Sequence, residues 1–220
     1  MDKIKANPEE KFSPQSVSMA MLGFQKQKST QKEVKMMLMA IATRMDSLDG
    51  QAIGNILYSL QRMTSDGKEV LRFLSSISKR IEMTLPSVTM KPQEIANALW
   101  GLQGMNSDAE EVRSILRSIT RKLEEAYINA KTRNTQLVFT AQGIGNALYG
   151  MQSMSDDVPE TIELLSYFPS IIMSSTDPMT PQDIGNAFFG LQGFSCASPE
   201  VKEILASLTV RMVISLMMTL

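Results

Sequence analysis

One short pattern recurs along this sequence, and its recurrence limits the possible folds more than any other feature. Residues 91–105 read KPQEIANALWGLQGM, and residues 140–154 and 180–194 read TAQGIGNALYGMQSM and TPQDIGNAFFGLQGF. Aligned on two glutamines ten residues apart, the chain contains five copies, whose second glutamines follow one another at 36, 42, 49 and 40 residues. Self-similarity at such a period is typical of stacked supersecondary units, so the copies indicate an architecture before they indicate a site.

Each copy contains two helical patterns joined by a polar turn. In the third copy Ile95, Leu99 and Leu102 share one face of a helix, and Pro92 suits its first turn. The turn that follows, MNSDAEE, contains serine and aspartate, which suit the N-cap of the second helix. Because a two-helix unit cannot bury its apolar faces alone, neighbouring units stack. We therefore predict an all-α fold, a right-handed α-solenoid of five helix-turn-helix repeats of about 36–49 residues each.

The predicted organisation is a polar N-terminal tail over residues 1–12 and a single solenoid domain over residues 13–220. The repeats are expected at about residues 13–48, 49–89, 90–138, 139–178 and 179–220. The longest junction, EEAYINAKTRNTQLVF, predicts an extended second helix followed by a loop, because the next copy resumes in register. The final pattern, VRMVISLMMTL, has no polar outer face, so we expect either a longer protein or an end that docks on a partner.

Composition removes several classes of function. The chain has 220 residues with 22 basic and 23 acidic side chains, and a net charge of −1 gives no broad attraction to polyanions. It has no histidine, which removes imidazole bases and the commonest transition-metal ligand. The single cysteine, Cys196, fits a reducing compartment. The sequence contains no phosphate-binding loop and no nucleophile beside a base, so we expect a non-catalytic protein without a cofactor or metal. No apolar run approaches the length that a membrane-spanning helix needs, so we expect no membrane span.

The first helix of copies two to five repeats a second set of positions beside its apolar stripe, whereas the first copy has Met19 and Leu22 where the others have asparagine and an aromatic. Gln93, Asn97 and Trp100 are spaced so that they share one helix face. Stacking aligns such positions in rows: the glutamines Gln51, Gln93, Gln142 and Gln182, the asparagines Asn55, Asn97, Asn146 and Asn186, and the aromatics Tyr58, Trp100, Tyr149 and Phe189. Amides donate and accept hydrogen bonds and aromatics stack, so these rows are candidates for contact with RNA or a protein partner.

A structural interpretation of the same positions stands beside the functional one. A repeated asparagine can satisfy polar groups of the neighbouring unit, and a repeated aromatic belongs most often to the core. Glycines such as Gly101 and Gly150 fit this interpretation because they permit close helix approach. Eighteen methionines, with Met63, Met105 and Met154 at one recurring position, indicate either adaptable packing or a plastic protein-binding surface.

The arginines of the second helices are candidates for phosphate contact, with a solvated charged face as the alternative. They are Arg72, Arg80, Arg113, Arg117 and Arg121.

The segment PQEIANALWGLQGM resembles the octotricopeptide repeat family, and the related repeats of FAST-kinase-like organellar proteins are similar too. The resemblance covers all five copies, from about residue 13 onward. It implies an α-solenoid that binds single-stranded RNA in a chloroplast or mitochondrion and influences transcript stability, processing or translation. It also implies that the asparagines of the first helices contact the RNA.

Two hypotheses of function follow. The first is an organellar RNA-binding protein, which predicts a continuous positive groove beside the amide row. The alternative is a protein interaction scaffold or accessory subunit of a large organellar assembly, such as a ribosome or a photosynthetic complex. Neutral charge, abundant methionine and the apolar C-terminal helix favour the alternative. A third possibility is that the chain belongs to a longer protein whose active part lies elsewhere.

Overall fold

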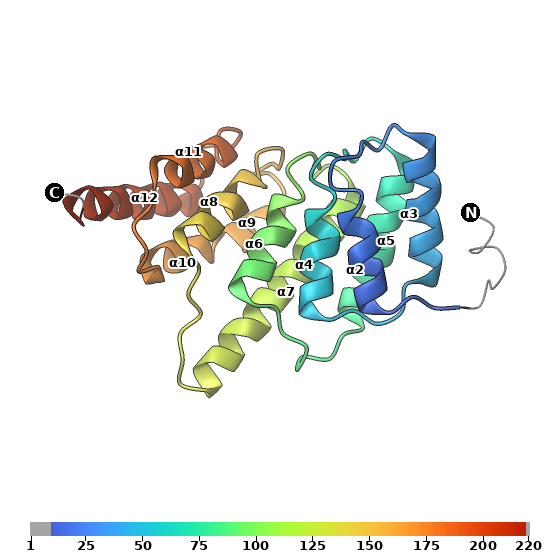
Figure 1. Cartoon of the computed structure of the whole chain (residues 1–220). Coiled ribbons are helices and arrows are strands. Elements are labelled where there is room, and N and C mark those ends of the chain that lie inside the picture. The colour runs from blue at the N-terminus through green and yellow to red at the C-terminus, as the bar shows by residue number, and fades with distance from the viewer. Residues whose placement is uncertain (1–9, 219–220) are drawn as a thin grey trace.

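The computed structural model describes residues 10–218, and all regular structure in that range is helical apart from one isolated bridge between Phe12 and Met45 (Figure 1). The all-α class is therefore confirmed. Most of the tail predicted for residues 1–12 lies outside the described residues. Within it, the Phe12 N–H donates to the Arg44 carbonyl oxygen at 2.9 Å, so this end of the tail is attached to the first copy.

The helices form two rows (Figure 1). The first row contains α2 (Pro14–Leu22), α4 (Gly50–Tyr58), α6 (Pro92–Trp100), α8 (Ala141–Tyr149) and α11 (Pro181–Gly190), each in contact with the next. The second row contains α3 (Lys32–Arg44), α5 (Lys68–Glu82), α7 (Glu110–Thr132), α9 (Pro159–Leu165) with α10 (Phe168–Ser174), and α12 (Pro199–Met218). The apolar stripes of both rows meet in one core, in which Ile95, Leu99 and Ile115 are fully buried.

The first-row helices begin where the sequence predicts. Pro92 and Pro181 occupy the first turns of α6 and α11. At α11 the Thr180 hydroxyl accepts from the Asp183 N–H at 3.2 Å, and the Asp183 carboxylate accepts from the Thr180 N–H at 2.9 Å. This reciprocal pair satisfies two donors that a helix start otherwise leaves unpaired.

The N-cap prediction for the turn serines is wrong. The N-cap residues of α5 and α7 are Gly67 and Ala109, and neither makes a side-chain cap. The turn residues instead bond forward to the next copy, where each accepts from a backbone N–H: Ser29 from Thr64 at 3.4 Å, Ser65 from Asn106 at 2.9 Å, Ser107 from Ser155 at 2.9 Å and Asp156 from Ser195 at 2.9 Å. A ladder of side-chain bonds thus links successive copies along the turns.

Glycines bring successive first-row helices into backbone contact, which confirms the packing interpretation. A Cβ atom at Gly101, Gly150 or Gly190 would lie 1.9–2.0 Å from a carbonyl oxygen of the preceding helix, those of Leu57, Leu99 and Leu148 respectively. On the opposite side of the helix, Gly54 and Gly145 face the following helix, at Glu94 and Asp183. The recurring methionines Met63, Met105 and Met154 are buried, so they serve packing.

The second row contains one prediction that holds and one that fails. α7 extends to Thr132 and an extended segment leads to α8, as the longest junction predicts. In the fourth copy the pattern predicts one second helix, but the chain forms two short ones, α9 and α10. Pro169 lies in the first turn of α10, and because proline has no N–H and its ring obstructs the preceding turn, a single helix cannot run through it.

Candidate binding surface

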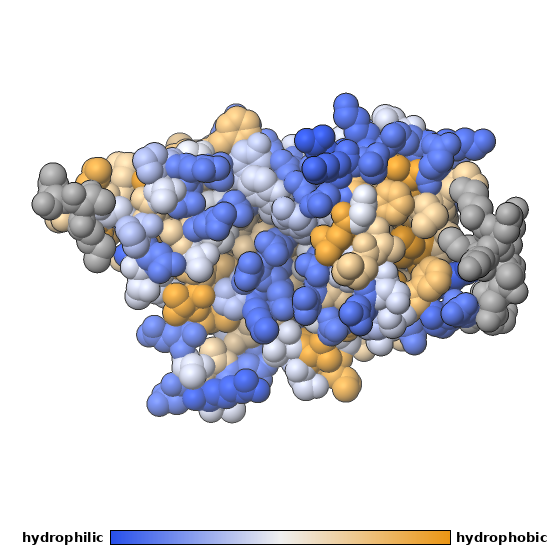
Figure 2. Space-filling model, in the orientation of Figure 1, coloured by the Kyte–Doolittle hydropathy of each residue, from blue (hydrophilic) through white to orange (hydrophobic). Residues whose placement is uncertain are grey.

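The outer surface of the first row contains a hollow of about 590 Å³ that reaches across α4, α6 and α8. Its lining includes Tyr58, Gln93, Asn97, Gln142 and Asn146, which the sequence analysis singled out. Figure 2 shows hydrophilic side chains over α6 and more apolar ones toward α2. A smaller hollow of about 320 Å³ lies between α2 and α4 and includes Gln51 and Asn55. The amides of α4, α6 and α8 therefore line recesses on one face of the first row.

The asparagines differ in what they contact. The Asn55 amide donates to the Ser18 hydroxyl of the preceding helix at 3.0 Å, as the structural interpretation predicts. Asn97 and Asn146 are half-buried in the larger hollow, and their side chains make no hydrogen bond to another described residue. Each carboxamide keeps two donors and an acceptor unused beside a recess. Asn186 on α11 is half-buried outside both hollows, and the glutamines, including Gln182, are exposed.

Three rings of the aromatic row, those of Trp100, Tyr149 and Phe189, stack on one another. The rings of Trp100 and Tyr149 lie 4.7 Å apart, centre to centre, at an interplanar angle of 24°, and those of Tyr149 and Phe189 lie 5.3 Å apart at 18°. The Trp100 indole N–H donates to the Gln61 side chain at 3.4 Å. Tyr149 therefore has a neighbouring ring on both sides and offers no free face to a nucleotide base. Phe189, at the end of the row, is 45% exposed.

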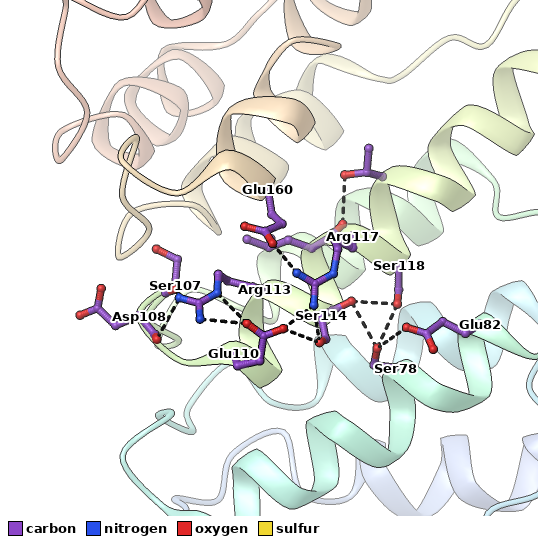
Figure 3. A network of polar contacts seen from close by, with 12 residues as sticks. Ser78, Glu82, Ser107, Asp108, Glu110, Arg113, Ser114, Arg117, Ser118 and Glu160 are labelled. Atoms are coloured by element: carbon purple, nitrogen blue, oxygen red, sulfur yellow. Dashed lines mark hydrogen bonds and ion pairs between the residues drawn. The ribbon is translucent and has the colours of Figure 1, made fainter.

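The candidate arginines lie on α5 and α7, in the second row, away from the amide hollow. Figure 3 shows that Arg113 and Arg117 both contact Glu110, and that Arg117 also contacts Glu160 of the next copy. Arg121 donates to the Ile81 and Glu82 carbonyl oxygens of α5.

Arg80 is also engaged, because its guanidinium donates to the Met45 carbonyl oxygen at 2.6 Å. Arg72 is exposed, and its guanidinium makes no ion pair or hydrogen bond with another described residue. Most of these cations therefore link neighbouring helices.

The charges of this network shift the pKa values of its members. Hydrogen bonds from Arg117 and Arg113 lower the pKa of the Glu110 carboxyl, and the same contact with Glu110 raises the pKa of Arg117. Burial lowers the pKa of Arg80. Further along α7, burial and the Glu124 carboxylate, which accepts from the Tyr167 hydroxyl at 2.6 Å, raise the pKa of Tyr167 to about 12. The lowered pKa of Glu110 and the raised pKa of Arg117 keep this pair ionised near neutral pH.

Sequence reasoning missed several residues of the hollow and one buried ion pair. Lys91, Val138, Phe139 and Thr140 also line it. They directly precede α6 and α8, so extending the repeat toward the N-terminal side identifies them. Lys122 lies within α7, which continues ten residues past it, and its side chain is fully buried. Its ammonium contacts the Glu125 carboxylate at 2.7 Å and the Val88 carbonyl oxygen at 3.0 Å.

The two hollows contain few charged side chains, and the charges along the chain are unevenly distributed. The lining of the larger hollow has one cation, Lys91, and the smaller has one anion, Asp49. These hollows do not form the continuous positive groove that the RNA hypothesis predicts. From residue 134 to the end the sequence has two basic residues and eight acidic ones. A polyanion is therefore repelled from the C-terminal copies.

Among residues 10–218 no cluster of three or more His, Cys, Asp or Glu side chains is arranged to hold a metal ion. No helix in the same range combines the length and apolar character needed to cross a membrane. Comparison with protein-family models, curated proteins and solved structures gave no match to this chain.

Proposed function

We propose that the chain is a non-catalytic binding protein, a right-handed α-solenoid of five repeats that holds an extended polypeptide segment along its amide row. It is thereby a protein interaction scaffold. The observation that carries the proposal is the pair Asn97 and Asn146, whose amides are half-buried, without partners among the described residues, and directed at one recess of about 590 Å³.

The spacing of the row suits an extended chain. Packed helices lie about 8–10 Å apart, and an extended chain advances about 3.3 Å per residue, so successive asparagines meet every third residue or so of a segment that crosses the helices. A carboxamide offers both a donor and an acceptor, which matches the N–H and C=O groups of a peptide backbone. The polypeptide repeats these groups at every residue, and therefore a nearly uniform row of amides suits a backbone more than a varied set of bases.

The charges favour a neutral ligand. Phosphate backbones bind through lysine and arginine, and the larger hollow contributes only Lys91. Four of the five candidate arginines are engaged by carboxylates or carbonyl oxygens within the second row. A peptide backbone needs no cation, so the recess suits it without further charge.

Single-stranded RNA is the second candidate, favoured by the free amides and by the resemblance to octotricopeptide repeats. The same resemblance adds an organellar location, in a chloroplast or mitochondrion, which imaging of a tagged chain in cells would test. Stacking of bases is disfavoured at Tyr149, whose ring is already covered on both sides.

The test is binding of the purified chain to an array of unstructured peptides and, in parallel, to a pool of single-stranded RNAs at two salt concentrations. We expect peptide binding that changes little with salt. An Asn97→Ala, Asn146→Ala double variant is expected to bind about 5- to 150-fold more weakly, because each lost hydrogen bond removes about 0.5–1.5 kcal/mol.

Asn129→Ala provides the matched control, because Asn129 lies on α7 and its amide bonds only its own helix, at the Glu125 carbonyl oxygen. The control is expected to bind as the wild type does. RNA binding that falls steeply with salt and disappears in the double variant would show that the ligand of this surface is RNA and not a polypeptide. Absence of both activities would refute the proposed surface.

A further inference from the structure

The C-terminal end of the first row exposes a surface that every earlier helix of the row buries. Gly185 occupies the same position in α11 as Gly54 and Gly145 in their helices, yet no atom of another element lies within 4 Å of its Cβ position. Phe188 is 40% exposed, whereas its equivalents Leu99 and Leu148 are fully buried. The outer face of α11 is therefore an apolar surface without a neighbouring helix in the described part of the chain.

The chain itself shows what covers such a face. At the three junctions from α4 to α11 the next helix places a glycine over the carbonyl oxygen that precedes the aromatic position, as Gly190 does over Leu148. One turn earlier, Ala98, Ala147 and Ala187 of the covering helices are fully buried. The partner that fits α11 is thus a helix of the same kind, with alanine and glycine three residues apart.

The other end of the molecule offers that helix uncovered. Ala20 and Gly23 of the first copy stand at the positions of Ala187 and Gly190, and both are exposed. The Cβ position of Gly23 has only carbonyl oxygens of its own copy nearby. The exposed side of α2 in one molecule can therefore cover the outer face of α11 in another, as first-row helices cover one another within the chain.

The charges of the two ends are complementary. Residues 13–48 contain five basic and two acidic side chains, while residues 134–220 contain two basic and eight acidic ones. An internal junction also supplies a specific pair, since Lys35 of the first copy contacts Glu69 of the second at 3.7 Å. The equivalent residues at the open ends are Lys202 and Glu33, both exposed. Head-to-tail contact brings these two side chains together as Lys35 and Glu69 are brought together inside the chain.

We propose that two copies of this chain associate head to tail, with α11 and α12 of one against α2 and α3 of the other, so that the new junction repeats the internal ones. Such a contact is heterologous, and because its ends stay open it extends to longer assemblies as concentration rises. The inference is independent of the ligand proposed for the amide row.

The first test measures molar mass by light scattering across a concentration series, with two variants that each block one end. Gly185→Gln adds a side chain where the isolated molecule has open space, and Ala20→Gln does the same on the exposed side of α2. We expect the wild type to form dimers and larger species, each variant alone to stay monomeric, and an equimolar mixture to form a dimer that grows no further. A wild type that is monomeric at every concentration, or an Ala20→Gln variant that associates as the wild type does, overturns the proposal.

The second test traps the junction covalently. Cys196 stands at the position of Ser107, and Lys28 stands at the position of Ser155, which are joined by the 2.9 Å bond of the turn ladder. Under an added mild oxidant, Lys28→Cys is expected to give a series of disulfide-linked multimers on a non-reducing gel. Lys79→Cys, on the exposed surface of α5, is the control and is expected to give none beyond the background of the wild type. Equal multimer yields from the two variants contradict the head-to-tail geometry.

Discussion

A matched pair of glycine substitutions separates the close packing of the first row from ordinary helix propensity. Gly150 is the C-cap of α8 and Gly185 lies within α11, but a methyl group added at the first is obstructed and one added at the second is not. At Gly150 the Cβ would lie 2.0 Å from the Leu99 carbonyl oxygen and 2.4 Å from its carbonyl carbon. At Gly185 it would meet nothing within 4 Å.

The two changes are expected to have opposite signs. In Gly150→Ala, α8 and α6 must separate by more than an ångström before the methyl group reaches van der Waals contact with Leu99, and overpacking of this kind costs about 1–3 kcal/mol or more. The obstructing atoms are backbone, so no side chain can rotate away. In Gly185→Ala the methyl group is unobstructed and the helix gains about 0.8–1 kcal/mol of propensity.

Chemical denaturation followed by circular dichroism measures both changes. We expect the midpoint to fall for Gly150→Ala and to rise for Gly185→Ala, with unchanged slopes. A Gly190→Ala variant, whose Cβ would lie 1.9 Å from the Leu148 carbonyl oxygen, is expected to behave as Gly150→Ala does. If Gly150→Ala is as stable as the wild type, the contact between the two helices is not as close as described, and the argument for repeated junctions fails.

Three further predictions concern the second row and the turns. Lys122→Met is expected to destabilise the chain by about 3 kcal/mol, measured by denaturation, because it leaves the Glu125 carboxylate without its buried cation. Ser107→Ala is expected to cost about 1 kcal/mol in the same assay, because the Ser155 N–H loses its acceptor. Since the pKa of Tyr167 is raised to about 12, its stabilising contribution is complete below its ordinary value of 10 and is lost as pH rises toward 12. Ultraviolet titration of the wild type beside Tyr167→Phe measures this shift, and an ordinary pKa would contradict it.

The sequence predicts those features that depend on residues close together in the chain. Apolar spacing predicts the helices, and Pro92 and Thr180 mark first-row starts that the structure confirms. The glycines were correctly assigned to close packing because their cost inside a helix demands a compensating contact. The alignment of the amides on one face follows from the same periodicity.

The features that the sequence does not predict depend on contacts between copies. Ser107 suits an N-cap by local rules, but its hydroxyl is closer to a backbone N–H of the next copy, 48 residues away. The burial of Lys122 follows only from the length of α7 and from the loop that covers it. Whether a given asparagine bonds its neighbour also depends on that neighbour. Asn55 donates to Ser18 of the preceding helix, whereas the residue at the position of Ser18 in the helix before Asn97 is Gly54, which has no side chain to accept a hydrogen bond.

This difference explains how one repeated position can serve both packing and binding. Two kinds of contact join neighbouring first-row helices: glycines packed against carbonyl oxygens of the preceding helix, and the hydrogen bonds of the turn ladder. Neither contact involves the asparagine side chain. Where the preceding helix has a hydroxyl at this position, as it does at Ser18, the asparagine amide donates a hydrogen bond to it and is not available to a ligand. Where it offers Ala96, which has no polar group, the amide of Asn146 stays available to a ligand. Ala96→Ser is therefore expected to weaken binding at the larger hollow while leaving the fold intact, because it gives Asn146 the internal partner that Asn55 already has.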